Sequence, residues 1–118
     1  MIKIKLAAIY KIEHITGYYY IGLSKDVFSR WSNHYTDLIM NKHSSTEFLN
    51  LFNSTRIEDW TFSILEYIST TELKKQTKLK GKSFDNYLRN YLLQREKHHM
   101  NQHSINFALN KNKRYFNK

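Results

Sequence analysis

The chain has 118 residues, of which 41% are hydrophobic and 15% aromatic, so we expect residues 1–118 to fold as one domain with a modest core rather than stay disordered. It contains no cysteine, no signal-peptide pattern and no apolar run near the roughly 18 residues that span a bilayer, which excludes disulfides, thiolate metal sites and a membrane helix and fits the cytoplasm. The formal net charge of +9 lies entirely in residues 71–118, which indicates a polyanionic partner.

The first elements predicted are two strands joined by a tight turn. Residues 3–12 alternate with the period of a half-buried strand. The pattern breaks at Glu13, and Gly17 is the residue there that takes φ > 0 without steric cost, as a bulged hairpin loop requires. An aromatic-rich second strand is predicted over residues 18–23.

The register of this hairpin decides which side chains meet. With a three-residue loop, Tyr10 lies opposite Tyr20, and Ala8 lies opposite Gly22. Opposed side chains share a face with Cβ atoms roughly 5 Å apart, so two phenols would stand side by side next to a gap left by two small residues. A slip of one residue would turn one phenol to the other face.

A helix is predicted next, with Ser24 as its N-cap and Asp26 in its first turn. Its apolar stripe consists of Val27, Trp31, Tyr35 and Leu38. Arg30 and His34 have i, i+4 spacing and fall on one margin of that stripe, near the sheet. Each alone fits a polar residue bordering a core, but beside two phenols they form a candidate site.

The remaining elements complete a small α+β fold. In chain order we expect a connection over 41–45, a helix over 46–52, a third strand over 60–68, a helix over 72–78 capped by residues 69–71, and a long helix from Ser83. Gly81 is expected to interrupt the helical conformation between the last two helices. The order β-β-α-α-β-α-α predicts a three-stranded, mainly antiparallel sheet flanked by helices.

Glu96 follows the apolar stripe of the long helix by one turn and is one of three acids after residue 70. A carboxylate there fits a surface ion pair with Arg95 or with the neighbours of Lys97. His99 and His103, also at i, i+4 spacing, raise the alternative of a Zn²⁺ site that would need His98 or Glu96 as a further ligand.

Basic residues of the C-terminal half fall into two clusters that fit phosphate contacts or, alternatively, a solvated surface. Phosphate contacts are salt-sensitive and independent of sequence, so they would position nucleic acid rather than read it. The clusters are Lys74, Lys75, Lys78, Lys80 and Lys82, then Lys111, Lys113, Arg114 and Lys118.

Together these residues resemble the GIY-YIG nuclease family, in particular the nuclease module of phage intron-encoded homing endonucleases. The likeness covers most of the chain. It runs over residues 8–38, which include Ala8-Ile9-Tyr10, Tyr20-Ile21-Gly22, Arg30 and His34, and continues over 43–45, 62–66, 94–96 and 105–106.

The resemblance implies a DNA endonuclease that uses Mg²⁺ or Mn²⁺ and takes Tyr10 as its general base. A free phenol has a pKa near 10, so it needs help to lose its proton at neutral pH. His34 is placed to accept or relay that proton, and Lys11 or Arg30 would lower the pKa of the phenol electrostatically.

Further roles follow from the same resemblance. Tyr20 would orient water or hold the scissile phosphate, and Arg30 would clamp the phosphate oxygens with its planar fork of donors. Glu96 would hold the metal ion. Asn106 would bind phosphate or orient Glu96, and Lys11 and His43 would contact DNA.

Two departures from the family pattern limit these expectations. Ala8 replaces the glycine of the first tripeptide, a mild change if that glycine serves close approach and a severe one if it needs φ > 0. The chain ends at Lys118 without a separate DNA-binding domain, so specificity would come from residues 71–118, from a protein partner, or be low. A monomer or weak homodimer would nick duplex DNA or cut its strands in sequence.

Two other classes of function stay open. One is a catalytically inactive nucleic-acid-binding protein with the same fold, and the other is an inhibitor of another nuclease or polymerase. The resemblance favours a phage or mobile-element origin, and with it the cytoplasm of a bacterial host.

Overall fold

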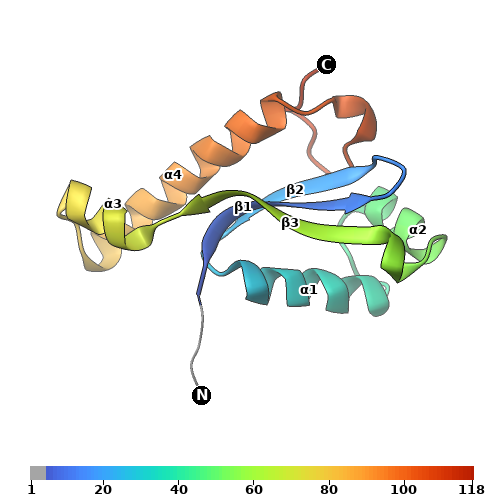
Figure 1. Cartoon of the computed structure of the whole chain (residues 1–118), viewed down its shortest axis with the longest axis horizontal. Helices are drawn as coiled ribbons and strands as arrows, with labels where there is room; N and C mark the ends of the chain where they lie inside the picture. The colour runs from blue at the N-terminus through green and yellow to red at the C-terminus, as the bar shows by residue number, and fades with distance from the viewer. Residues whose placement is uncertain (1–4) are drawn as a thin grey trace.

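The computed structural model describes residues 5–118 as a three-stranded sheet between two layers of helices (Figure 1). The predicted α+β class and element order are confirmed, whereas the part of the first strand predicted over residues 3–4 lies outside the described residues. The elements are β1 (Ala7–His14), β2 (Tyr19–Ser24), α1 (Val27–Ile39), α2 (Thr46–Asn53), β3 (Trp60–Ile68), α3 (Thr70–Thr77) and α4 (Gly81–Asn101), with short 3₁₀ turns η1 (Ile57–Asp59) and η2 (Ile105–Phe107).

The sheet has the order β2-β1-β3, and both pairings are antiparallel. Helix α4 covers one face, while α1 lies on the other (Figure 1). The prediction of a half-buried first strand is wrong, because β1 is central and both of its faces are covered. Ile9 packs into the core cluster that includes Leu88 and Leu92 of α4, and Tyr10 into the cluster that includes Val27 of α1.

The hairpin register differs from the predicted one by two residues. Tyr10 pairs with Gly22, and Ile12 with Tyr20. The shift arises because Gly17, at φ 103°, lies inside a loop over residues 15–17 rather than at its flank. An even shift keeps the same faces, so the rings of Tyr10 and Tyr20 still lie together with centroids 6.5 Å apart.

Helix α1 begins and packs differently from the prediction. Its N-cap is Asp26, whose carboxylate accepts the Ser29 N–H at 3.5 Å, while Ser24 only accepts the Asp26 N–H. His34 is 2% exposed and belongs to the buried stripe, whereas Tyr35 is 38% exposed. The predicted stripe therefore placed the histidine too far from the core.

The connection between the last two helices was also predicted incorrectly. Helix α3 ends at Thr77 because Lys78 takes the left-handed conformation with φ 57°. Gly81 is the first residue of α4, so this helix begins two residues before the predicted Ser83. Within residues 5–118, none of the helices has the length and apolar composition that crossing a membrane requires.

After α4 the chain returns to the free edge of β2. The Leu109 N–H donates to the Tyr19 carbonyl at 2.7 Å. The side chain of Asn110, buried at 6% exposure, then pairs with the backbone of Ile21: its Oδ1 accepts the N–H at 3.0 Å and its Nδ2 donates to the carbonyl at 2.7 Å. The strand that carries Tyr20 is thus held from both sides.

Candidate active site

A cavity of about 390 Å³ lies at the edge of β2, lined by residues of both strands of the hairpin and of α1 and α4. Four of the six expected catalytic residues line it, although they come from distant parts of the sequence. Its lining consists of Tyr10, Tyr20, Gly22, Leu23, Arg30, Arg89, Leu93 and Glu96.

The side chain of Tyr10 reaches this cavity by crossing directly over Gly22. A Cβ atom at Gly22 would lie 2.3 Å from the Tyr10 phenol oxygen and 2.5 Å from Cζ, so no other residue fits without displacing the ring. Gly22, the last residue of the second tripeptide, therefore leaves the space that the ring of Tyr10, the last residue of the first tripeptide, occupies.

Ala8, the residue that departs from the family pattern, lies fully buried in β1 opposite Ser24. It is not among the described non-glycine residues with positive φ, which are Asn41 and Lys78. Alanine fits this extended backbone without strain, so of the two alternatives left open by the sequence the mild one holds.

Tyr10 begins a buried chain of hydrogen bonds that runs away from the cavity. Its phenol oxygen lies 2.6 Å from Nε2 of His34, and Nδ1 of His34 lies 2.8 Å from Nε2 of His43. The backbone N–H of Ser45 donates to Nδ1 of His43 at 3.0 Å. His43 is 8% exposed and engaged at both nitrogens, so the expected DNA contact by this residue does not fit its position.

Burial raises the pKa of Tyr10 and that of Tyr20, because the protein interior disfavours a phenolate. The neighbouring Arg30 opposes both shifts. Lys11 cannot assist: it lies on the other face of β1, pairs with Glu13 at 3.3 Å and stands over the ring of Tyr19. The expectation that Lys11 lowers the pKa of Tyr10 is therefore wrong.

Burial also lowers the pKa of His34, to about 3, and the positive charges of Arg30 and of a protonated His43 act in the same direction. The pKa of His43 is lowered as well, chiefly by burial. Both imidazoles are thus neutral at neutral pH.

Glu96 is the carboxylate of the cavity, and burial raises its pKa to about 7 against the opposing charges of Lys97 and Arg30. Such a desolvated carboxylate gains from a cation beside it. Among the described residues, no group of three or more His, Cys, Asp or Glu side chains could hold a metal ion. A lone carboxylate fits Mg²⁺, which keeps several waters and binds through one or two carboxylates together with a phosphate.

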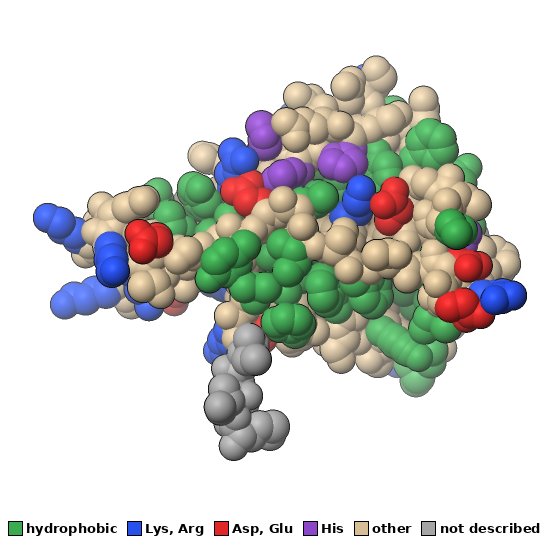
Figure 2. All heavy atoms as spheres, in the orientation of Figure 1, with side chains coloured by type: hydrophobic (Ala, Val, Ile, Leu, Met, Phe, Trp, Pro, Cys, Tyr) green, Lys and Arg blue, Asp and Glu red, His purple; other side chains and the backbone are tan. Residues whose placement is uncertain are grey.

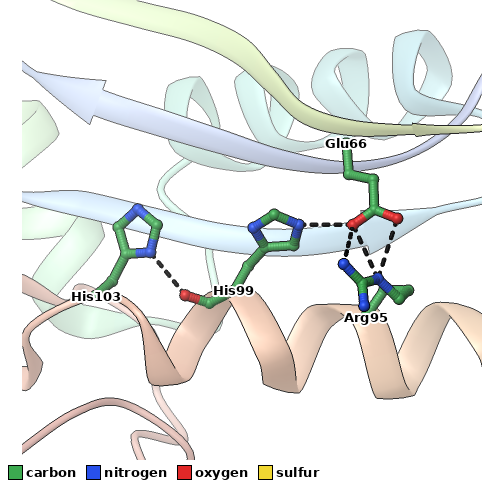
Figure 3. Close-up of polar contacts among 4 residues, drawn as sticks. All are labelled: Glu66, Arg95, His99 and His103. Atoms are coloured by element: carbon green, nitrogen blue, oxygen red, sulfur yellow. Dashed lines mark hydrogen bonds and ion pairs between the residues drawn. The ribbon is translucent and has the colours of Figure 1, made fainter.

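The zinc alternative at the end of α4 is wrong. Nε2 of His99 bonds Glu66 of β3 at 2.8 Å, and Nδ1–H of His103 donates to the His99 carbonyl at 2.7 Å (Figure 3). Arg95 binds the same carboxylate through Nε and Nη2 at 2.8–3.0 Å, so its partner is Glu66 and not Glu96. This cluster joins α4 to β3.

Asn106 does not lie in the site. It is exposed in η2, where its N–H donates to the Ser104 hydroxyl. The buried asparagine is Asn110, which braces β2 next to Tyr20 and lines an adjoining cavity. The expected role of Asn106 near Glu96 is therefore wrong, and the mismatch arose because the two asparagines are four residues apart in a segment without periodic pattern.

The basic residues divide into two locations. Lys74, Lys75, Lys78, Lys80 and Lys82 are exposed around α3 and the start of α4, and Figure 2 shows cationic side chains projecting at that end of the molecule. Lys111 and Lys97 line a second cavity of about 480 Å³ that shares Tyr20, Leu93 and Glu96 with the first. Lys113 pairs with Glu47 at 2.5 Å, and Arg114 lies over the ring of Tyr115.

Arg89 lines the Tyr10 cavity but is not among the site residues predicted from the sequence. It precedes Glu96 by seven residues, which places both on one face of α4. That spacing was the signal that could have found it.

Comparison with known proteins gives a consistent result. Residues 6–106 match the family model described as the GIY-YIG catalytic domain. A mutant form of the catalytic domain of intron endonuclease I-TevI aligns with a TM-score of 0.70 at 24% identity, covering 94% of this chain and 98% of that one. A second structure of the catalytic domain of this homing endonuclease aligns with a TM-score of 0.63 at 24% identity, covering 89% and 99%. A comparison with curated proteins gives no match.

Proposed function

Because the chain belongs to the GIY-YIG catalytic domain family, a family of nucleases, we propose that it is an endonuclease that hydrolyses phosphodiester bonds in double-stranded DNA with the help of Mg²⁺ or Mn²⁺. The observation that supports this most is the convergence of a phenol, two guanidinium groups and a carboxylate on one cavity. These are the groups that phosphodiester hydrolysis needs: a base, positive charge for the phosphate, and a cation ligand.

Tyr10 acts as the general base that removes a proton from the attacking water. Its oxygen is held at a fixed place by His34 on one side and by the bare backbone of Gly22 below. Tyr20, with its ring stacked beside that of Tyr10, orients the water or the phosphate. Fixed placement of this kind contributes to rate because no reorganisation is needed during reaction.

Arg30 and Arg89 enter the cavity from α1 and α4, so a phosphate between them meets guanidinium groups from two sides. Each guanidinium offers a planar fork of donors that matches two phosphate oxygens. Glu96 would hold the divalent cation, which when bound supplies charge neutralisation at the phosphate and stabilises the leaving 3′ oxygen.

The two adjoining cavities suggest how DNA lies on the protein. Both follow α4, with Lys97 and Lys111 at the second cavity. Lys82, at the start of α4, precedes Glu96 by fourteen residues, or about 21 Å along the helix axis at 1.5 Å per residue. Basic groups thus flank the reactive site on both sides of the path, and we assign Lys74, Lys75, Lys78, Lys80 and Lys82 to phosphate contacts beyond it.

The test is cleavage of supercoiled plasmid with Mg²⁺ and with EDTA. Arg30→Ala and Glu96→Gln should each lower the rate by about 10²–10³-fold, the cost of removing one group that stabilises developing charge. Arg56→Ala and Glu72→Gln are matched controls, since both side chains are exposed and line neither cavity. Cleavage that persists in EDTA, or in both site variants, would refute the proposal.

The cavity that gathers Tyr10, Arg30 and Glu96 within residues 5–118 also supports nicking, because one such site cuts one strand and the second strand is then cut in a later event. A time course should then show the nicked circle before the linear form. Linear product that appears without a nicked intermediate at one protein per plasmid would contradict a monomeric nickase and favour a homodimer.

A further inference from the structure

In the chain of hydrogen bonds from Ser45 through His43 and His34 to Tyr10, each donor and acceptor can be assigned. The backbone N–H of Ser45 sets this assignment. The N–H of Ser45 donates to Nδ1 of His43 at 3.0 Å, so this nitrogen carries a lone pair and no proton. A peptide N–H has no acceptor form, so this bond cannot reverse. Ser45 is 2% exposed and is the N-cap of α2, which fixes the position of the amide.

The direction passes from one ring to the next. A neutral His43 without a proton on Nδ1 carries it on Nε2, and this N–H donates to Nδ1 of His34 at 2.8 Å. By the same argument His34 carries its proton on Nε2, which donates to the phenol oxygen of Tyr10 at 2.6 Å. Burial lowers the pKa of both histidines and keeps them neutral.

The packing around these rings holds their orientation. The ring of Phe48, which is fully buried, lies 4.8 Å from that of His43, and the ring of Tyr20 lies 4.8 Å from that of His34. Neighbours this close oppose a rotation that would exchange the ring nitrogens for carbons.

We propose that His43 is a positioning residue that fixes His34 as a hydrogen-bond donor to Tyr10, leaving the proton of the phenol directed into the cavity. The nitrogen of His34 that faces the phenol is already protonated, so His34 cannot accept the proton of Tyr10, contrary to the sequence-based expectation. Tyr10 instead releases its proton through the cavity to solvent. The resulting phenolate, bonded by His34 and favoured by Arg30, takes the proton of the attacking water.

The catalytic part of this inference depends on the proposed function, but the hydrogen-bond direction does not, so two measurements separate them. The first is ¹⁵N NMR of the histidine-labelled protein at neutral pH without DNA. We expect His34 and His43 each to show a protonated Nε2 and an unprotonated Nδ1. A His34 protonated on Nδ1 would overturn the proposal, whereas the expected tautomers in a protein that does not cleave DNA would count against the proposed function alone.

The second measurement compares variants at position 43. His43→Gln can present an amide donor to Nδ1 of His34 and should keep the tautomer, whereas His43→Glu presents a carboxylate acceptor and should reverse it. A catalytic histidine held in the wrong tautomer can cost about 10⁴-fold in rate, so the Gln variant should cleave plasmid at least tenfold faster than the Glu variant. Cleavage rates that do not follow the His34 tautomer across wild type and both variants would overturn the proposal.

Discussion

The two sides of the cavity are built in opposite ways. On the hairpin side, Tyr10, His34 and His43 are 1–8% exposed and joined by hydrogen bonds that end on a backbone amide. On the side of α4, Arg89 and Lys97 are exposed at the mouth of the cavities. In the proposed function, the buried side holds one oxygen in place for proton transfer, and the open side supplies positive charge to the DNA backbone.

Among substitutions on the buried side, Gly22→Ala is expected to have the largest effect on cleavage. The added methyl group must displace the Tyr10 ring, and a displacement of about 1 Å at a reacting group can cost roughly 10²-fold in rate. We expect at least a hundredfold loss of plasmid cleavage. Ala8→Gly is the control and should change the rate less than tenfold, because the strand backbone there is extended; equal losses in both variants would show that Gly22 has no special role.

The pH dependence of cleavage measures the buried phenol directly. The pKa of Tyr10 is raised by burial, so the reactive phenolate fraction should increase about tenfold per pH unit up to at least the ordinary phenol pKa near 10. Single-turnover rates should therefore rise steadily from neutral to alkaline pH, beyond the range in which Glu96 titrates. A rate that is flat above pH 8 would exclude Tyr10 as the base.

Stability in acid tests the same side without any substrate. The pKa of His34 is about 3 in the folded protein against 6.5 for an ordinary histidine, so between these values the unfolded chain binds more protons. The free energy of unfolding is therefore unaffected by this group above pH 6.5. Below pH 6.5 it decreases by up to about 1.4 kcal/mol per pH unit, because the unfolded chain takes up the proton first. His34→Gln should show a shallower acid dependence of the free energy of unfolding in urea titrations, whereas exposed His98→Gln should match wild type.

Substitutions on the open side should have a smaller effect, which is measured in DNA binding. Lys111→Ala should weaken DNA binding at every sequence and reduce the slope of log K against log[salt] by about 0.9, the contribution of one phosphate contact. Lys113→Ala should change the slope less, because this lysine is paired with Glu47. Equal slopes for both variants would contradict the proposed DNA path along the second cavity.

The sequence predicted the elements better than it predicted the site. Alternation and turn residues located the three strands, and the shared face of Tyr10 and Tyr20 survived a register shift because the shift was even. The burial of His34 was not predictable, since it depends on how α2 closes over α1. Asn110 was missed because it gains its partner only when the C-terminal segment reaches β2, a contact across 89 residues.

We propose that the oxygen of Tyr10 performs the proton transfer of DNA cleavage. Tyr10→Phe removes that oxygen and keeps the ring over Gly22, so it should leave the fold and DNA affinity unchanged. Single-turnover cleavage of a supercoiled plasmid with Mg²⁺ should then be slower by about 10²–10⁴-fold, the contribution of a positioned general base. A Tyr10→Phe protein that cleaves at the wild-type rate would contradict the role of Tyr10 as the general base.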